Sequence, residues 1–167
     1  MTFEVVSAVR RATRLPVIPK LSPNVADITV FARASEEAGA TALSCINTLL
    51  GLAYDPATRA PALGAGGGGL SGPAVKPAGL HAVFHCFART GLPIVGMGGV
   101  ASVQDVVEYL AAGASAVGLG TALFRDPGLP AQILPELDAE LARRGRASVA
   151  ELVGCAHQAS AKALQEI

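Results

Sequence analysis

Charged and aromatic side chains are scarce in this sequence. Only 16% of its 167 residues are charged, 4% are aromatic and tryptophan is absent. The 13 basic and 13 acidic residues cancel to a formal net charge of zero. A balance of this kind provides neither a basic surface for nucleic acid nor an acidic tail. We therefore expect no nucleic-acid partner.

Long apolar runs are also missing, although 51% of the residues are hydrophobic. No run approaches the ~20 residues that a bilayer span requires, and the N-terminus lacks the charged-then-apolar order of a signal peptide. Cys45, Cys86 and Cys155 are widely spaced, and His81 and His85 have no third ligand near them in sequence. The composition thus predicts a cytoplasmic protein with reduced thiols, no membrane segment and no metal site.

Short apolar segments alternate with amphipathic ones along the chain. Strands are predicted at 15–20, 41–46, 92–97 and 115–119. Helices are predicted at 3–13, from Asn24 to Gly39, and at 77–89, 102–112, 130–144 and 148–167, with a long loop at 47–76. Apolar strands that alternate with helices form a parallel sheet, so the predicted fold class is α/β.

The number of units predicts the architecture. About four βα units are present, half of what a complete (β/α)₈ barrel requires. A helix precedes the first predicted strand, which favours a missing first half over closure of the barrel by two copies. We expect residues 1–152 to form the C-terminal half of a (β/α)₈ TIM barrel and residues 153–167 to form a helical tail.

Two glycine-containing turns follow the last two predicted strands. Gly98 and Gly99 end the strand at 92–97, and Gly120 and Thr121 come after the strand at 115–119. Without a Cβ atom, the backbone amides of such turns can approach a phosphate closely. Many (β/α)₈ barrels bind phosphate after strands 7 and 8. The pattern therefore predicts a phosphorylated ligand.

Polar residues also end the first two predicted strands. Lys20 could pair with an anion, act as a Schiff-base nucleophile, or be a solvated loop lysine. The amide of Asn47 and the hydroxyl of Thr48 could bind a carbonyl, a carboxylate or a ring edge, or Asn47 could simply begin the turn. The glycines of segment 69–77 permit close approach to a flat ligand, although a flexible linker would have a similar sequence.

Taken in order, these motifs resemble the class 1 dihydroorotate dehydrogenases, flavoproteins of pyrimidine biosynthesis. The matching segments are 20–24, 46–51, 69–77, 96–100, 113–117 and 120–121. The Lys-Leu-Ser-Pro-Asn and Asn-Thr-Leu-Leu-Gly forms are most similar to the B-type, NAD-linked bacterial enzymes. The resemblance implies oxidation of dihydroorotate to orotate with FMN as cofactor.

The resemblance also implies roles for individual residues. Lys20 would lie against the flavin, and Asn47 and Thr48 would bind orotate. The remaining FMN contacts would come from Ile46, Gly72, Gly98, Gly99, Gly120 and Thr121. The intact enzyme would be a homo-oligomer working beside an electron-transfer subunit that carries FAD and an iron–sulfur cluster.

A catalytic base is not among the implied residues. In the B-type family it is a cysteine from the first half of the barrel, and none of the three cysteines matches that motif. We therefore expect the isolated chain to be inactive. Two other functions fit the same residues: a phosphate-binding lyase or isomerase that uses Lys20, and a non-catalytic module that completes a barrel with a separately encoded first half.

Overall fold

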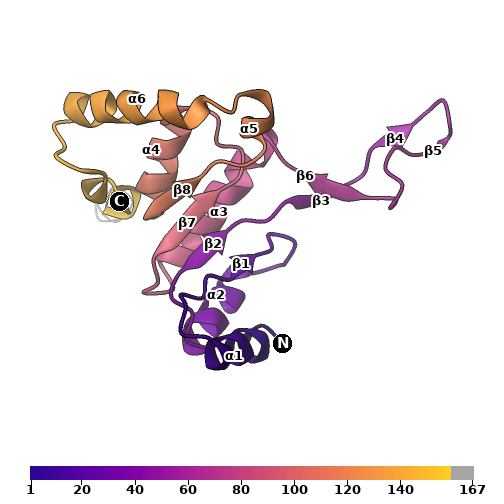
Figure 1. Cartoon of the computed structure of the whole chain (residues 1–167), viewed down its shortest axis with the longest axis horizontal. Helices are drawn as coiled ribbons and strands as arrows, with labels where there is room; N and C mark the ends of the chain where they lie inside the picture. Colours follow the sequence, from indigo (N-terminus) through magenta and orange to yellow (C-terminus); the bar gives the residue numbers. More distant parts are fainter. Residues whose placement is uncertain (159–167) are drawn as a thin grey trace, which may run out of the picture.

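The computed structural model describes residues 1–158 and contains a central sheet of four parallel strands in the order β1-β2-β7-β8 (Figure 1). These strands are β1 (Lys20–Leu21), β2 (Leu43–Cys45), β7 (Ile94–Met97) and β8 (Ala116–Gly118). Their order follows the sequence without reversal, as in a barrel, whereas a doubly wound sheet reverses its direction at a switch point. The predicted α/β class, as part of a TIM barrel, is confirmed.

Helices connect and flank these strands. They are α1 (Thr2–Ala12), α2 (Ile28–Glu37), α3 (Lys76–Phe87), α4 (Val103–Ala112), α5 (Ala122–Arg125) and α6 (Leu129–Arg143), with short 3₁₀ helices η1 (Pro73–Val75) and η2 (Val149–Glu151). Each pair of neighbouring parallel strands is joined through a helix, and such crossovers are nearly always right-handed, which puts successive connecting helices on the same face of a sheet. No helix within residues 1–158 is long and apolar enough to cross a membrane.

The hydrophobic core lies between the sheet and these helices. Leu43 and Ile94 are paired across β2 and β7 and are fully buried, as is Tyr109 of α4. The Tyr109 ring packs against β7, where a Cβ atom on Gly96 would lie only 2.6 Å from the ring carbon Cδ1. Glycine in this strand therefore makes room for an aromatic side chain directly beneath the carboxyl end of the sheet.

Two predicted elements differ from the structure at their starts. The strand predicted at 15–20 pairs only at Lys20–Leu21, because Pro16 and Pro19 have no N–H to donate to a ladder. Helix α2 begins after Asp27, whose carboxylate accepts a hydrogen bond from the Thr29 N–H, and not at Asn24. The Asn24 side chain instead binds the loop after β2.

The prediction of a long loop at 47–76 is wrong, because this segment folds into an arm of two antiparallel ribbons. Strand β3 (Leu49–Gly51) pairs with β6 (Gly68–Leu70), and β4 (Tyr54–Asp55) pairs with β5 (Ala60–Pro61). Figure 1 shows this arm projecting away from the central sheet. In the predicted helical tail, η2 and a helical turn at 155–158 are present. Residues 159–167 lie outside the described part.

Candidate functional site

A cavity of about 690 Å³ opens at the carboxyl ends of the parallel strands. Its size falls within the range of about 300–1,000 Å³ that small-molecule sites occupy. All nine residues predicted from the sequence line it: Lys20, Ile46, Asn47, Thr48, Gly72, Gly98, Gly99, Gly120 and Thr121. The fold therefore brings together residues that are spread over a hundred positions of the chain, and their individual roles stay predictions.

The β7–α4 turn (residues 98–102) forms one wall of this cavity. Gly98 and Gly99 have φ angles of +123° and +72°, which L side chains rarely adopt. A Cβ atom on Gly99 would lie 2.8 Å from the Gly72 carbonyl oxygen and 2.9 Å from the Lys76 backbone nitrogen. Glycine at this position thus lets the β7–α4 turn pack directly on the β6–α3 turn (residues 71–75).

The turn after β8 lies beside the turn after β7, because Met97 and Gly118 are register partners in neighbouring strands. It carries Gly120 and Thr121, both exposed and both lining the cavity. Within residues 1–158, the backbone amides of Gly99, Gly120 and Thr121 donate to no protein acceptor. Neighbouring N–H groups with this freedom are suited to hold an anion.

Side chains of α4 fix the β7–α4 turn from below. The Tyr109 hydroxyl donates a hydrogen bond of 2.8 Å to the Gly98 carbonyl. Burial raises the pKa of Tyr109, so the hydroxyl stays protonated and remains a donor. One oxygen of Asp105 accepts hydrogen bonds from the Ala101 N–H and the Ser102 hydroxyl, both at 2.9 Å.

The other oxygen of Asp105 faces Lys76. The Lys76 Nζ atom lies 2.6 Å from Asp105 Oδ1 and 2.9 Å from Glu108 Oε2. Burial alone would raise the pKa of Asp105, but hydrogen bonds from Lys76, Ala101 and Ser102 outweigh it and lower that pKa. The pKa of Lys76 is raised, chiefly by its hydrogen bond to Asp105. Both groups are therefore charged at neutral pH.

At the other end of the cavity, Asn24 holds the loop after β2. Its Nδ2 atom donates to the Thr48 carbonyl at 2.9 Å, and its Oδ1 atom accepts from the Leu50 N–H at 2.8 Å. The Asn47 Oδ1 atom accepts a hydrogen bond from the Thr48 N–H at 2.8 Å. Within the described chain the Asn47 Nδ2 atom has no protein partner, which leaves it available to a ligand.

Comparison with known proteins identifies the family. The family model described as dihydroorotate dehydrogenase matches residues 1–141. The chain belongs to the dihydroorotate dehydrogenase family. The resemblance seen in the sequence is thereby confirmed.

Curated relatives fall into two named types. The chain is 50% identical over 154 residues to a "Dihydroorotate dehydrogenase B (NAD(+)), catalytic subunit" of Desulforamulus reducens, covering 92% of this chain and 51% of the relative. It is 48% identical over 158 residues to a protein of the same name from Desulforudis audaxviator, covering 95% and 52%. A "Putative dihydroorotate dehydrogenase A (fumarate)" of Solibacter usitatus is 50% identical over 151 residues, covering 90% and 50%. The chain spans about half the length of these relatives.

Four polar residues that line the dihydroorotate dehydrogenase cavity are not among the nine predicted ones: Ser71, which lies in the matching segment 69–77, and Arg125, Asp126 and Gln132, for which the sequence predicted no role. Asp126 accepts hydrogen bonds from the Gly128 N–H and from Gln132 Nε2, both at 2.9 Å, and so organises the start of α6. Arg125 brings a cation to the cavity. Its position in the helical turn directly after Gly120 and Thr121 is the signal that could have identified it.

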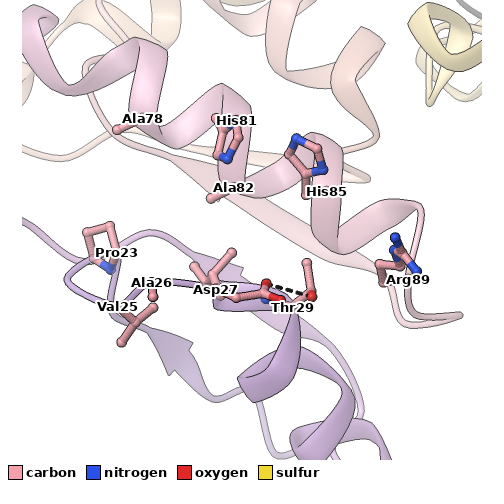
Figure 2. A pocket seen from close by; sticks show the side chains of 11 residues that line it. Pro23, Val25, Ala26, Asp27, Thr29, Ala78, His81, Ala82, His85 and Arg89 are labelled. Atoms are coloured by element: carbon pink, nitrogen blue, oxygen red, sulfur yellow. Dashed lines mark hydrogen bonds between the residues drawn. The ribbon is translucent and has the colours of Figure 1, made fainter.

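A second, smaller cavity of about 290 Å³ lies between the start of α2 and α3 (Figure 2). It contains the two histidines considered above, and the ring centroids of His81 and His85 are 4.3 Å apart. Hydrogen bonds from the Thr29 hydroxyl and N–H lower the pKa of Asp27, which caps α2. None of the nine predicted site residues lines this cavity. In residues 1–158 no group of three or more His, Cys, Asp or Glu side chains is arranged to hold a metal.

Proposed function

We propose that this chain is the FMN-phosphate and orotate-binding half of a dihydroorotate dehydrogenase that oxidises dihydroorotate to orotate in pyrimidine biosynthesis. The observation that supports this proposal most directly is that two adjacent turns have backbone amides without a protein acceptor, at Gly99, Gly120 and Thr121. These turns line a cavity that is also lined by Lys20 and Asn47. Membership of the dihydroorotate dehydrogenase family supports a flavin as the ligand of this cavity.

The residues fit FMN at both of its ends. The turns after β7 and β8 would bind the phosphate through backbone N–H groups, where no side chain of Gly99 or Gly120 intervenes. Lys20 would lie against the ring system, where a cation stabilises negative charge that builds up there. Ile46 and Gly72 would line the ring through backbone contacts. When bound, FMN supplies the hydride acceptor of the reaction.

Asn47 and Thr48 would bind the orotate ring. The available Nδ2 of Asn47 is a donor for a carbonyl or carboxylate oxygen, and the Thr48 hydroxyl can donate or accept. Both residues follow β2 and lie in the same cavity as Lys20. In this arrangement the substrate would lie beside the flavin ring, and the FMN phosphate would lie at the turns after β7 and β8.

We also propose that the isolated chain is inactive. None of the residues lining the cavity is a cysteine, so the base of the B-type reaction would come from the other half of the barrel. Loss of a general base alone costs about 10²–10⁴ in rate. The intact protein would be a cytoplasmic homo-oligomer paired with an electron-transfer subunit that carries FAD and an iron–sulfur cluster.

Flavin binding to the purified chain is the direct test. The fluorescence of FMN should be quenched when it binds. FMN should bind at least about tenfold more tightly than riboflavin, since only FMN has a phosphate for the two turns to bind. Equal affinities, or no binding of either flavin, would contradict the proposed phosphate site. Co-expression with the first half of the Desulforamulus reducens relative should then yield a yellow complex that oxidises dihydroorotate, while the chain alone does not.

Carbonyl trapping separates this proposal from the Schiff-base alternative. Lys20 is exposed, whereas Schiff-base lysines are activated by an apolar pocket or a neighbouring cation. Borohydride treatment in the presence of a phosphorylated aldehyde should therefore leave the mass of the chain unchanged. A covalent adduct on Lys20, absent in Lys20→Arg, would favour the lyase function instead.

A further inference from the structure

Lys76 connects two turns that border the cavity from different parts of the chain. It is the first residue of α3, and its Nζ atom contacts Asp105 at 2.6 Å and Glu108 at 2.9 Å, both on α4. The second oxygen of Asp105 accepts from Ala101 and Ser102 in the β7–α4 turn. A single carboxylate thus joins the start of α3 to the turn that begins at Gly98.

The β6–α3 and β7–α4 turns are in direct contact, with no room for a side chain between them. At Gly99 the place of a Cβ atom is taken by the Gly72 carbonyl and the Lys76 amide, at 2.8 and 2.9 Å. Any relative movement of the β6–α3 and β7–α4 turns would therefore either open a gap or produce a clash. Gly72 and Gly99 both line the cavity, so their spacing sets the width of its wall.

The network acts from behind the cavity. Gly72, Pro73 and Val75 are among the cavity-lining residues, whereas Lys76 is not. Lys76 faces two carboxylates, so the three groups together carry one net negative charge. A negative charge does not attract a phosphate. Any benefit of this network to phosphate binding is therefore geometric.

We propose that Lys76 and Asp105 form a latch that fixes the spacing of the two turns, making both of them positioning residues for the FMN phosphate. This inference rests on the proposed function. Removing one member of a partly buried ion pair leaves the other without its partner and loosens what the pair held. The latch thus accounts for a lysine that does not line the cavity and is only partly exposed.

Three variants test the latch by the ratio of riboflavin to FMN dissociation constants, measured by fluorescence quenching. Lys76→Met and Asp105→Asn should each lower this ratio about tenfold or more, while the affinity for riboflavin changes less than about twofold. Glu108→Gln, the matched control, removes only the more exposed carboxylate and should keep the ratio within about threefold. Lys76→Arg should restore most of the preference lost in Lys76→Met. A general loss of structure would lower both affinities together.

Asp105→Asn separates the latch from direct phosphate binding by Lys76. If Lys76 bound the phosphate itself, removing the Asp105 charge would leave the ammonium group facing one carboxylate, Glu108, instead of two, and the preference for FMN would rise. A raised preference in Asp105→Asn would overturn the latch. An unchanged preference in both Lys76→Met and Asp105→Asn would overturn it as well.

Hydrogen exchange in the ligand-free chain gives a readout that is independent of flavin. The hydrogen-bonded amides of the two turns, the Val75 N–H on the Gly72 carbonyl and the Ala101 N–H on Asp105 Oδ2, should exchange about tenfold faster in Lys76→Met than in the wild type, with amides of β2 unchanged. Unchanged exchange in both turns would overturn the latch even if FMN binds. A wild-type chain without any preference for FMN would overturn the proposed function. The exchange rates would then still show whether Lys76 fixes the spacing of the two turns.

Discussion

The Asn24 side chain donates a hydrogen bond of 2.9 Å to the carbonyl of Thr48, twenty-four positions later in the chain. The same amide accepts from the Leu50 N–H at 2.8 Å. The loop after β1 therefore holds the loop after β2 by a two-sided contact. This fixes Thr48, and with it the end of the cavity lined by Asn47 and Thr48, relative to Lys20.

Replacement of Asn24 should test that contact. Asn24→Ala removes both hydrogen bonds to the loop after β2, together with the one that Nδ2 donates to Ser22 Oγ, and should destabilise the chain by about 1–3 kcal/mol, because each net hydrogen bond contributes about 0.5–1.5 kcal/mol. Asn24→Asp keeps the acceptor for Leu50 and loses the donor to Thr48, so it should fall between the alanine variant and the wild type. Urea unfolding measures both. Equal stability of all three chains would show that the contact does not hold the loop.

Arg125 should contribute charge to the phosphate end of the site. Arg125→Gln should reduce the preference for FMN over riboflavin by about three- to tenfold, because a charge-assisted contact to phosphate is lost. The remaining preference should depend less on salt than that of the wild type. Arg11→Gln makes the same charge change in the last turn of α1 and serves as the control. If both variants lower the preference equally, only net charge is involved.

Substitution by alanine should destabilise the chain at Gly99 but not at Gly120. Gly99→Ala forces a side chain onto a φ of +72° and against the Gly72 carbonyl, and it should cost about 1–3 kcal/mol or more. A Cβ atom on Gly120 meets nothing within 4 Å, so Gly120→Ala should leave thermal stability nearly unchanged. The difference in melting temperature between the two variants measures the packing of the β6–α3 turn on the β7–α4 turn. Equal melting temperatures would contradict that packing.

Local sequence patterns were sufficient to predict most of the fold and the location of the site. Apolar runs predict the strands at 92–97 and 115–119, and the helix predicted at 102–112 starts at Ser102, whose side chain accepts from the Asp105 N–H. Glycines at the strand ends predict the turns after β7 and β8, because a single glycine is enough to meet the need for a positive φ or for a missing Cβ atom.

The rest depends on contacts between distant residues. Lys76 and Asp105 are 29 positions apart, and no local pattern pairs them. The helix predicted to start at Asn24 begins after Asp27 instead, because asparagine is favoured both at helix starts and in loops. The arm at 47–76 escaped prediction because β3 and β6 contain glycines, which have low strand propensity, and pair through their backbones.

Acid should weaken the ion pair between Lys76 and Asp105. The folded pKa of Asp105 lies below its ordinary value of 3.8, so the ion pair stabilises the fold fully above that value. This contribution is lost as the pH falls through the lower pKa of the folded state. The raised pKa of Lys76 acts in the opposite direction, and its contribution is lost only at strongly alkaline pH. Between these limits the latch should be insensitive to pH.

The comparison of wild type with Asp105→Asn isolates this effect from the other carboxylates, of which Asp27 and Asp55 also have lowered pKa values. The free energy of unfolding, measured in urea from pH 7 down to acid, should fall more steeply for the wild type below about pH 4 than for Asp105→Asn, because only the wild type takes up the Asp105 proton on unfolding. The two curves should therefore converge in acid and stay parallel above about pH 5. Curves that remain parallel throughout would mean that Asp105 titrates alike in the folded and unfolded chain, and that Lys76 does not hold it.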